Sequence, residues 1–578
     1  MKKNKLYSLL ALLMIASMIL AACEGATDDA SSGDDSGSSE EATEAEHDDG
    51  DDHSEEAAAF EGTSVAAASC DYGGKISSIT AVDEFTVQFD LCKSDPAFLA
   101  KIAFTPFGIQ PSEWIAETGG TGELLEKPIG TGPYMVAEWD RGNQVVFSRF
   151  DGYWGEAGAA ETVTLRWLTE GAARLQELQA GTADFITNVA PDDYAVIEAD
   201  PDLVLIPQDN PNILYLAMTN TFAPFDDVRV RQAVAMGIDR ERIVENFYTT
   251  GSTVPSHFTP CSIPGGCEGE DWYAFDAEAA RALLADAGFP DGFETAIYYR
   301  DVFRAYLPEP PLVAQELQAQ LEANLGITAE IIPMESGEFI AASTDGQLDG
   351  FYLLGWGADY PHVTNFLDFH FGSGNPQFGE THPEIYEPLE VASTISDPAE
   401  AAALYEEANN AIRELVPMVP LANGGVAHAA LASLDGAYYP PFGANEFYRM
   451  TPTNDDSDYV DMVYVQNAEP ISLYCADETD GESLRPCQQV VETLLDYATD
   501  SGDTVPELAT SCTGNDDSTV WVCELREGVT FHDGSSFDAN DVVASWAAGI
   551  DASSPYHVGN TGGFDYFAYL WDGLINAE

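Results

Sequence analysis

The cysteines are the residues of this chain whose type and spacing indicate chemistry most directly. The chain has 578 residues and nine cysteines. Apart from Cys23 they are even in number, which in an exported protein favours disulfides, although sequence alone does not fix their connectivity. Local context favours one pattern, in which two pairs flank predicted hairpins, one brackets a tight loop and the last two remain for each other: Cys70–Cys92, Cys512–Cys523, Cys261–Cys267 and Cys475–Cys487. The rival interpretation is a zinc site, but the sequence has no CxxC pair with the usual ligand spacing, so no metal is predicted.

The first cysteine has a different setting. Three lysines among the first five residues precede an apolar run over residues 6–20, which is too short to span a bilayer. The run ends in Leu20-Ala21-Ala22-Cys23, which resembles a bacterial lipobox. This resemblance implies a signal peptide over residues 1–22 and lipid on Cys23, with an ordinary signal peptide as the alternative. No other stretch of the sequence is long and apolar enough to span a membrane.

Charge excludes some partners. The chain carries 22 Lys and Arg against 99 Asp and Glu, a net charge of −77. Nucleic acid is excluded as a partner because phosphate backbones require a basic footprint. We interpret the acidity as a salt-adapted, halophilic surface, because concentrated salt screens carboxylate repulsion; the alternative is a surface that attracts cationic ligands. Residues 23–68 are predicted to be an acidic, disordered tether, since they cannot bury enough apolar surface to offset the entropy of ordering.

The rest of the chain has the pattern of an α/β protein. Residues 82–91 alternate as a strand does, and residues 276–289 have an N-cap aspartate, an apolar face and a closing glycine. A second helix is predicted over 312–325 and leads directly into a strand over 327–332. Helices alternating with strands favour α/β lobes.

Several stretches resemble one protein family. The matches include LREGVTFHDG at 525–534, GTGPY at 130–134, GYWG at 152–155, PFDDVRVRQAVAMGIDRERIV at 224–244 and GWGADYPHVTNFL at 355–367. Together they resemble the extracellular solute-binding proteins of ABC importers, in the peptide/nickel/oligosaccharide class known as family 5. The resemblance implies a two-lobed periplasmic-binding-protein-like fold of the large class, with an extra subdomain.

The order of these stretches differs from that of the family. The family's opening segment resembles residues 485–546, whereas the segments that should follow it begin near Gly73. A polar break at about 451–458 separates the family's usual end from its usual start, and a strand is expected over 462–466. We therefore interpret the chain as circularly permuted, which requires Glu578 to lie beside the stretch near Gly73. A misjoined gene is the rival explanation.

The permuted alignment predicts five parts. They are a signal peptide (1–22), a tether (23–68), an extra subdomain of lobe I (69–125 plus 506–578), the core of lobe I (126–222 plus 436–505) and lobe II (223–435).

One motif carries the prediction of a ligand site. In the peptide-binding members that this chain resembles, a Trp-x-x-Asp stretch faces the cleft and its aspartate accepts the α-ammonium group of the ligand. The matching residues are Trp356 and Asp359, and Tyr360 is the third predicted ligand-binding residue. A desolvated ammonium group needs a fixed anionic acceptor, and Trp356 can supply an apolar or cation–π wall. The chain departs from the family after Pro361, which leaves a helix-capping role for Asp359 as the alternative.

The resemblance implies a function of capture and delivery. We expect a monomeric, lipid-anchored receptor on the outer face of the cell membrane that binds short peptides between two closing lobes and delivers them to an ABC permease. No enzymatic activity and no cofactor are expected. Alternatives with the same fold bind oligosaccharides or a nickel chelate. A secreted hydrolase and a non-transporting adhesin are alternatives of other classes, although the sequence lacks the GxSxG and HExxH motifs of common hydrolases.

Overall fold

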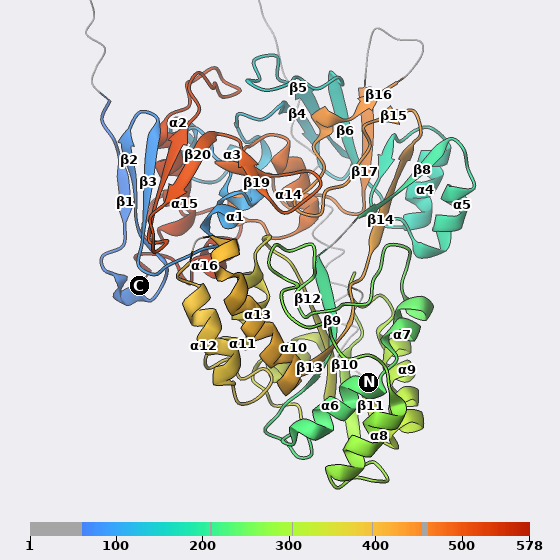
Figure 1. Ribbon diagram of the computed structural model, residues 1–578. Coiled ribbons are helices and arrows are strands. Elements are labelled where there is room, and N and C mark those ends of the chain that lie inside the picture. The colour runs from blue at the N-terminus through green and yellow to red at the C-terminus, as the bar shows by residue number, and fades with distance from the viewer. Residues whose placement is uncertain (1–59, 209–210, 303, 396, 454–460, 578) are drawn as a thin grey trace, which may run out of the picture. The chain divides into compact units, whose positions relative to one another are not determined.

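The computed structural model describes residues 60–208, 211–302, 304–395, 397–453 and 461–577 (Figure 1). The predicted signal peptide, Cys23, most of the predicted tether and most of the polar break lie outside these residues. The predicted tether extends too far, because residues 64–66 form a strand that pairs with residues 78–80. Among the described residues, no helix combines the length and the apolarity needed to cross a membrane.

The first sheet combines residues from both ends of the described chain. Its five antiparallel strands, in spatial order, are β1 (Ser64–Ala66), β2 (Ile76–Asp83), β3 (Thr86–Leu91), β21 (Val520–Leu525) and β20 (Ala509–Gly514). Figure 1 shows the blue β1–β3 beside the red β20. The packing helices are α1 (Phe98–Ile102), α2 (Ser112–Thr118), α3 (Glu123–Glu126), α15 (Ala539–Ile550) and α16 (Asp565–Leu570). The single strand predicted over 82–91 is wrong in part, because a turn at Glu84-Phe85 divides it into a hairpin.

Aromatic side chains from the two ends interlock in the core of this subdomain. Phe98 stacks on Trp521 with ring centroids 5.0 Å apart, and Phe89 meets the edge of Trp546 at 5.0 Å. Backbone hydrogen bonds also join the ends, since Lys75 N donates to Trp571 O at 2.8 Å. The last hundred residues therefore do not form a separate module.

The second sheet is the core of lobe I. Its seven strands, in spatial order, are β4 (Tyr134–Asp140), β5 (Gln144–Arg149), β6 (Thr162–Trp167), β17 (Asp461–Gln466), β7 (Phe185–Ile186), β14 (Val426–Leu431) and β8 (Leu203–Gln208). The predicted strand at 462–466 is confirmed as β17, which lies in the middle of the sheet and pairs in parallel with β6 and β7. The nearby helices are α4 (Gly171–Gln179), α5 (Tyr194–Glu198) and α14 (Gly481–Gln488).

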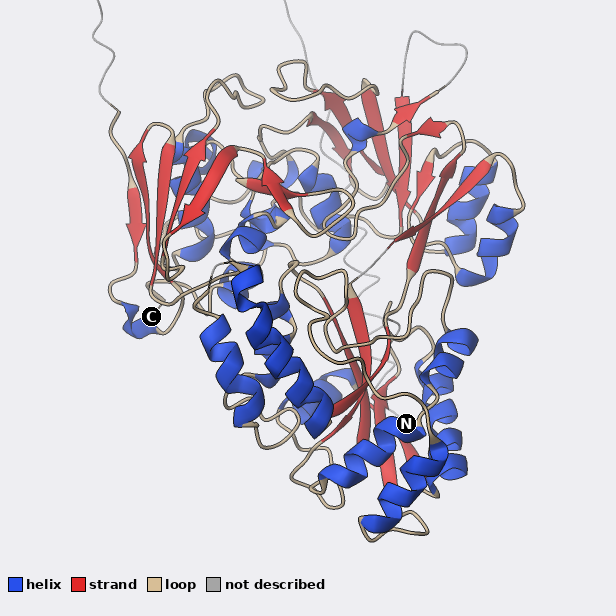
Figure 2. Cartoon of the chain, in the orientation of Figure 1, coloured by secondary structure: helices blue, strands red, loops and turns tan. Residues whose placement is uncertain are grey.

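The third sheet forms lobe II. Its strands, in spatial order, are β11 (Thr328–Met334), β10 (Glu294–Arg300), β12 (Phe351–Gly357), β9 (Asn212–Met218) and β13 (Met418–Ala422). Figure 2 shows helices on both sides of this sheet, and β9 is buried along its whole length, as a central strand with both faces covered should be. The helices are α6 (Val228–Gly237), α7 (Arg240–Phe247), α8 (Ala277–Asp286), α9 (Pro310–Leu325), α10 (Ser336–Thr344), α11 (Leu367–Phe371), α12 (Pro383–Ala392) and α13 (Pro398–Leu415).

The structure confirms both helices predicted in lobe II, α8 and α9, and the residue predicted to begin α8 and the one predicted to end α9 do so. Asp276 caps α8 by accepting hydrogen bonds from Glu278 N and Ala279 N, and α9 stops at Gly326, whose φ of 69° suits glycine. Two short strand pairs complete the fold: β15 (Leu434–Asp435) with β16 (Thr451–Pro452), and β18 (Leu495–Tyr497) with β19 (Thr504–Pro506).

Two predicted lobe boundaries need correction. β9 was assigned to lobe I within 126–222, but it pairs with β12 and β13 of lobe II. β14 was assigned to lobe II within 223–435, but it pairs with β7 and β8 of lobe I. The chain therefore crosses between the lobes before β9 and again between β13 and β14. Apolar runs show that these strands are buried, but not in which sheet.

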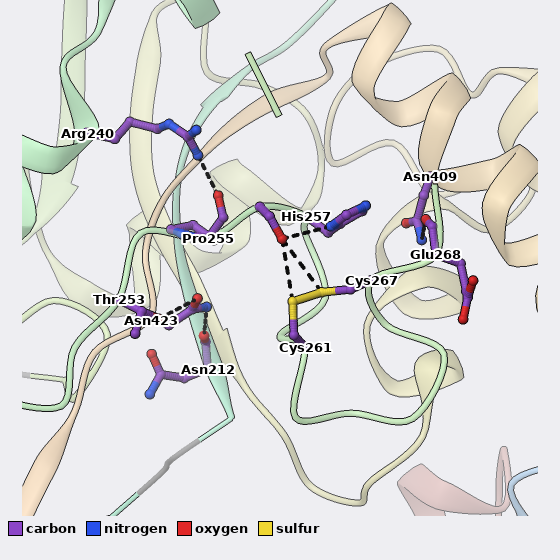
Figure 3. The surroundings of a disulfide bond; sticks show 11 residues. Asn212, Arg240, Thr253, Pro255, His257, Cys261, Cys267, Glu268, Asn409 and Asn423 are labelled. Atoms are coloured by element: carbon purple, nitrogen blue, oxygen red, sulfur yellow. Dashed lines mark hydrogen bonds between the residues drawn. A yellow bond between two sulfur atoms is a disulfide. The ribbon is translucent and has the colours of Figure 1, made fainter. Parts of the chain in front are cut away.

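All four predicted cysteine pairs are disulfides in the structure. Figure 3 shows the surroundings of the Cys261–Cys267 bond, where Ser256 Oγ lies 3.4 Å and 3.7 Å from the two sulfurs and 2.9 Å from His257 Nδ1. Within the described part of the chain, His257 and these cysteines are the one group of His, Cys, Asp and Glu spaced to hold a metal ion. Their sulfurs are joined to each other, so they are not the thiolates that a metal needs.

Candidate functional site

The predicted ligand residues follow the end of β12. This strand runs parallel to β10, and Ala358 N, one residue beyond its end, donates to Pro211 O at 2.8 Å on the segment that enters lobe II from lobe I. Asp359 therefore lies beyond the carboxyl end of a central strand and near a connection between the lobes. This is the edge where open α/β sheets bind ligands.

The Asp359 carboxylate is fixed by an amide and not by a cation. Asn365 Nδ2 donates to Asp359 Oδ2 at 3.1 Å, and Asn365 Oδ1 accepts hydrogen bonds from Asp359 N and Trp356 Nε1, each at 3.1 Å. Burial raises the pKa of Asp359 to about 6, and the Asn365 hydrogen bond opposes this rise. No salt bridge to Asp359 occurs among the described residues. The site therefore holds an acceptor that a ligand cation would stabilise.

The alternative role of Asp359 as a helix cap is not what the structure shows. His362 is the N-cap of the following 3-10 turn, Val363–Asn365, and its ring accepts from Thr364 N. The next helix, α11, begins without a side-chain cap.

Aromatic rings from both lobes surround this acceptor. Trp356 stacks on Phe369 with ring centroids 4.3 Å apart, and Phe369 meets Tyr569 of lobe I at 6.1 Å. Phe369 and Tyr569 keep 38% and 40% of their surface exposed, which is high for large rings. Burial, and then the nearby charge of Asp359, raise the pKa of Tyr569. Exposed rings beside a half-buried charge form a wall suited to an organic cation.

The Tyr360 side chain does not join these aromatic rings and contacts other residues. Its ring is buried, its hydroxyl lies 3.3 Å from Thr364 Oγ1, and Lys101 Nζ of lobe I lies 5.2 Å from the ring centroid. Tyr360 therefore lines a space between the lobes whose lining does not include Asp359.

That space is a cavity of about 460 Å³, which we call the lysine cavity. Lobe I contributes Lys75, Lys93, Asp95 and Lys101 to its lining, and Tyr360 and Asp368 of lobe II are among the residues opposite. No sequence pattern predicts this cavity, because Lys75 and Lys93 flank a hairpin and Lys101 lies on α1. Only the fold brings these lysines to Tyr360.

A second cavity of about 530 Å³ also has residues of both lobes in its lining. It includes Arg174, His428 and Tyr439 of lobe I and Tyr248 and Ala305 of lobe II. None of the described residues that line it is an Asp or Glu, so we call it the acid-free cavity. In a chain with 99 carboxylates, such a lining provides aromatic and uncharged polar surface for side chains of varied type.

The charges of the acid-free cavity are held within the fold. Arg174 donates to the carbonyl oxygens of four neighbouring residues: Leu168, Thr169, Thr187 and Asn188. His428 stacks on Tyr439 at 3.7 Å, and burial holds the pKa of its ring well below the ordinary value. The cavity therefore has one charged side chain, and backbone carbonyls satisfy it.

The carboxylate of a peptide ligand would need a cation, and four arginines of lobe II are candidates: Arg281, Arg300, Arg304 and Arg413. The structure sets two aside, since Arg281 donates to Ala323 O and Arg413 pairs with Glu270. Arg300 donates to Ser336 Oγ at 3.0 Å, and Arg304 directly precedes Ala305 of the acid-free cavity.

The comparisons with known proteins point to one family. The profile of the bacterial extracellular solute-binding proteins, family 5 middle region, matches residues 43–378 and 503–564. Heme-binding protein A of Haemophilus influenzae is 29% identical over 383 residues, covering 64% of this chain and 69% of that protein. Di/tripeptide-binding protein 1 of Pseudomonas aeruginosa is 30% identical over 385 residues, covering 65% and 71%.

Solved structures agree. HbpA2 from Haemophilus parasuis matches with a TM-score of 0.62 at 27% identity, covering 66% of this chain and 76% of that one. DppA from Helicobacter pylori, solved with the peptide STSA, matches with a TM-score of 0.51 at 25% identity, covering 66% and 75%.

Proposed function

Because this chain belongs to family 5 of the bacterial extracellular solute-binding proteins and has their two-lobed fold, we propose that it is the receptor of an ABC importer that captures short peptides between its lobes. The observation that carries this proposal is the half-buried Asp359 carboxylate, which has an amide partner and an aromatic wall but no cation among the described residues.

An α-ammonium group suits this acceptor. It would replace water with a charge-assisted hydrogen bond, which is about twice as strong as a neutral one. The rest of a short peptide would extend toward the acid-free cavity, whose largely aromatic and uncharged polar lining tolerates varied side chains. Haem, the ligand in the name of the Haemophilus influenzae relative, has no ammonium group to bind to Asp359.

The proposal includes no catalytic step. The relatives reported above are binding proteins by name. His532, a residue type often used in catalysis, lies 2.9 Å from Gly132 O through Nε2 and accepts from Gly130 N, so it fixes the turn at 130–132. A peptide that is recovered intact after prolonged incubation with the protein would support a receptor, and a cleaved peptide would support a hydrolase.

The proposal extends to position in the cell. The family is extracellular, and we add that lipid on Cys23 holds a monomer to the outer face of the membrane, with the acidic segment as its tether and salt-adapted acids on its surface. Replacing Cys23 with Ser should release the protein from membranes into the medium, whereas unchanged membrane attachment would contradict a lipid anchor.

We also propose that the order of segments is a true circular permutation. Three observations support it: residues 461–577 supply strands to both sheets of lobe I, Asn576 Nδ2 donates to Ala66 O at 3.1 Å, and the family profile matches in two separate pieces. A reordered chain that starts at residue 461 and joins residue 577 to residue 60 should fold with the same melting temperature. Aggregation of that chain would contradict the proposal.

The test of function is a thermal-shift screen in high salt against dipeptides to hexapeptides, oligosaccharides, nickel and haem. A true ligand at a hundredfold excess over its Kd stabilises by about 2.7 kcal/mol. Peptides should raise the melting temperature of the wild type but not of Asp359→Asn. A response to oligosaccharide or nickel alone would overturn the peptide assignment.

A further inference from the structure

We propose that the lysine cavity is a subsite for an anionic group on the first residue of the captured peptide, so that peptides beginning with Asp or Glu are preferred ligands. This inference rests on the proposed function, because it takes Asp359 as the residue that binds the α-ammonium group. It adds a charge preference at the first side chain.

The first observation is the concentration of lysines. Beyond Cys23 the chain has four lysines, and three of them, Lys75, Lys93 and Lys101, line this one cavity. Acids outnumber bases 99 to 22 in the sequence, whereas lysines and aspartates each contribute three residues to this lining. The cavity lining is therefore far richer in cations than the chain as a whole.

The second observation is how the acidic residues of the lining are used. Asp95 is 1% exposed; its Oδ2 accepts from Lys75 at 2.9 Å and from Lys101 at 2.6 Å, and its Oδ1 accepts from Ala97 N at 3.1 Å. Both oxygens of Asp95 are thus occupied, and one carboxylate faces two ammonium groups. The Lys75 ammonium group has three donors and uses one of them for Asp95, which leaves it able to bind an incoming anion.

The other two acidic residues of the lining, Asp572 and Asp368, repel a bound anion only weakly. Asp572 is exposed to solvent and acts at the rim, where water screens its charge. Asp368 is the acid opposite the lysines in lobe II, and its Oδ1 is buried with no hydrogen-bond partner among the described residues. Burial raises the pKa of Asp368 to about 7, so this carboxyl is partly protonated near neutral pH and can then donate a hydrogen bond to an anion.

The third observation is that the cavity adjoins the proposed ammonium site. Asn365, whose amide holds the Asp359 carboxylate, also lines the cavity. Phe369 and Tyr569, the exposed rings beside Asp359, line it as well. A ligand whose ammonium group lies at Asp359 would therefore have its first side chain beside this cavity. Lysine is a suitable partner for such a carboxylate because its ammonium group binds from many directions.

The experiment compares two peptides that differ by one charge. Isothermal titration of the full-length protein with Glu-Ala and Gln-Ala should give about tenfold tighter binding of Glu-Ala, a difference of about 1.4 kcal/mol. Lys75→Gln and Lys93→Gln should each reduce this ratio, with the larger reduction for Lys75, and should leave the Kd of Gln-Ala unchanged. Lys127→Gln is the matched control, because Lys127 is the one lysine beyond Cys23 outside the cavity lining, and it should preserve the ratio.

Three outcomes would overturn the inference in different ways. Equal affinity of the wild type for the two peptides would remove the subsite and leave peptide binding intact, whereas binding of neither would contradict the proposed function itself. If Lys75→Gln loses the same affinity for both peptides, Lys75 supports closure of the lobes and does not bind the side-chain carboxylate. If acetate alone stabilises the protein as strongly as Glu-Ala does, the cavity binds a free anion and its assignment to the solute is wrong.

Discussion

Asp95 and Asp359 are two carboxylates on opposite lobes, the first buried and the second half-buried, and their surroundings differ. Asp95 accepts hydrogen bonds from two lysines. Burial alone would raise its pKa, but the charges of Lys101 and Lys75 lower that pKa below its ordinary value. Asp359 has one amide as its side-chain partner, and burial raises its pKa. We therefore expect Asp95 to stabilise the fold, and we propose that Asp359 is completed by a ligand cation.

The largest expected effect that separates the two residues is on stability. Asp95→Asn leaves two ammonium groups facing a neutral amide, so we expect the free energy of unfolding to fall by about 3–5 kcal/mol. Denaturant unfolding at fixed salt measures this change. Asp151→Asn is the control, because the Asp151 side chain is 86% exposed in its ion pair with Arg149, and its effect should stay within about 0.5 kcal/mol. If Asp95→Asn lowers the free energy of unfolding by less than about 1 kcal/mol, the Asp95 carboxylate is not needed to stabilise the two lysines.

The same substitution at Asp359 should act in the opposite direction. The raised pKa means that the folded carboxyl retains its proton more strongly than the unfolded one, so its contribution to stability is lost as the pH rises from about 4 to about 6. Asp359→Asn has no such loss, and above pH 6 the ligand-free variant should be more stable than the wild type by up to about 3 kcal/mol. Urea unfolding at a series of pH values measures the difference. A variant less stable than the wild type at pH 7 would make Asp359 structural.

Much of the fold could be predicted from local sequence, because the residues that end a helix or form a disulfide lie close together along the chain. Asp276 and Gly326 fix ends of α8 and α9 through backbone geometry, and each disulfide joins cysteines close in sequence. The predicted lobe boundaries were wrong because β9 and β14 are both apolar strands. An apolar sequence shows that a strand is buried but does not show which sheet it joins. Sheet membership is decided by pairing over long sequence distances.

The candidate site was predictable only in part. Trp356 and Asp359 were found by resemblance to a family motif, and the structure places them together with Asn365, which the sequence did not single out. Tyr360 was predicted with them, yet its ring lies under Lys101. The lysine cavity had no sequence signal, because its three lysines come from a hairpin and a helix and share no spacing rule.

A third prediction concerns the pH dependence of binding. An ammonium ligand requires ionised Asp359, so the apparent affinity falls with the fraction of this residue that is ionised. With a pKa of about 6 in the ligand-free protein, the Kd for a dipeptide without other charged groups should rise about tenfold between pH 7 and pH 5. Titration calorimetry in one buffer salt measures it. A Kd that is constant over this range would mean that the ligand does not bind through this carboxylate.

The smallest expected effect concerns Tyr360, between the two carboxylates. Tyr360→Phe removes the contact with Thr364 but keeps the ring under Lys101, so stability should change by about 1 kcal/mol or less. Peptide affinity should change less than about twofold, because the ring faces the lysine cavity and not Asp359. A large loss of affinity with unchanged stability would restore Tyr360 as a direct ligand contact.

The most direct test of the central claim is the affinity of wild type and Asp359→Asn for Ala-Ala and for N-acetyl-Ala-Ala, which has no ammonium group. We predict that the wild type binds Ala-Ala at least about a hundredfold more tightly than the acetylated peptide, and that the variant binds both weakly and equally. Equal binding of the two peptides by the wild type would contradict the assignment of Asp359 as the ammonium acceptor.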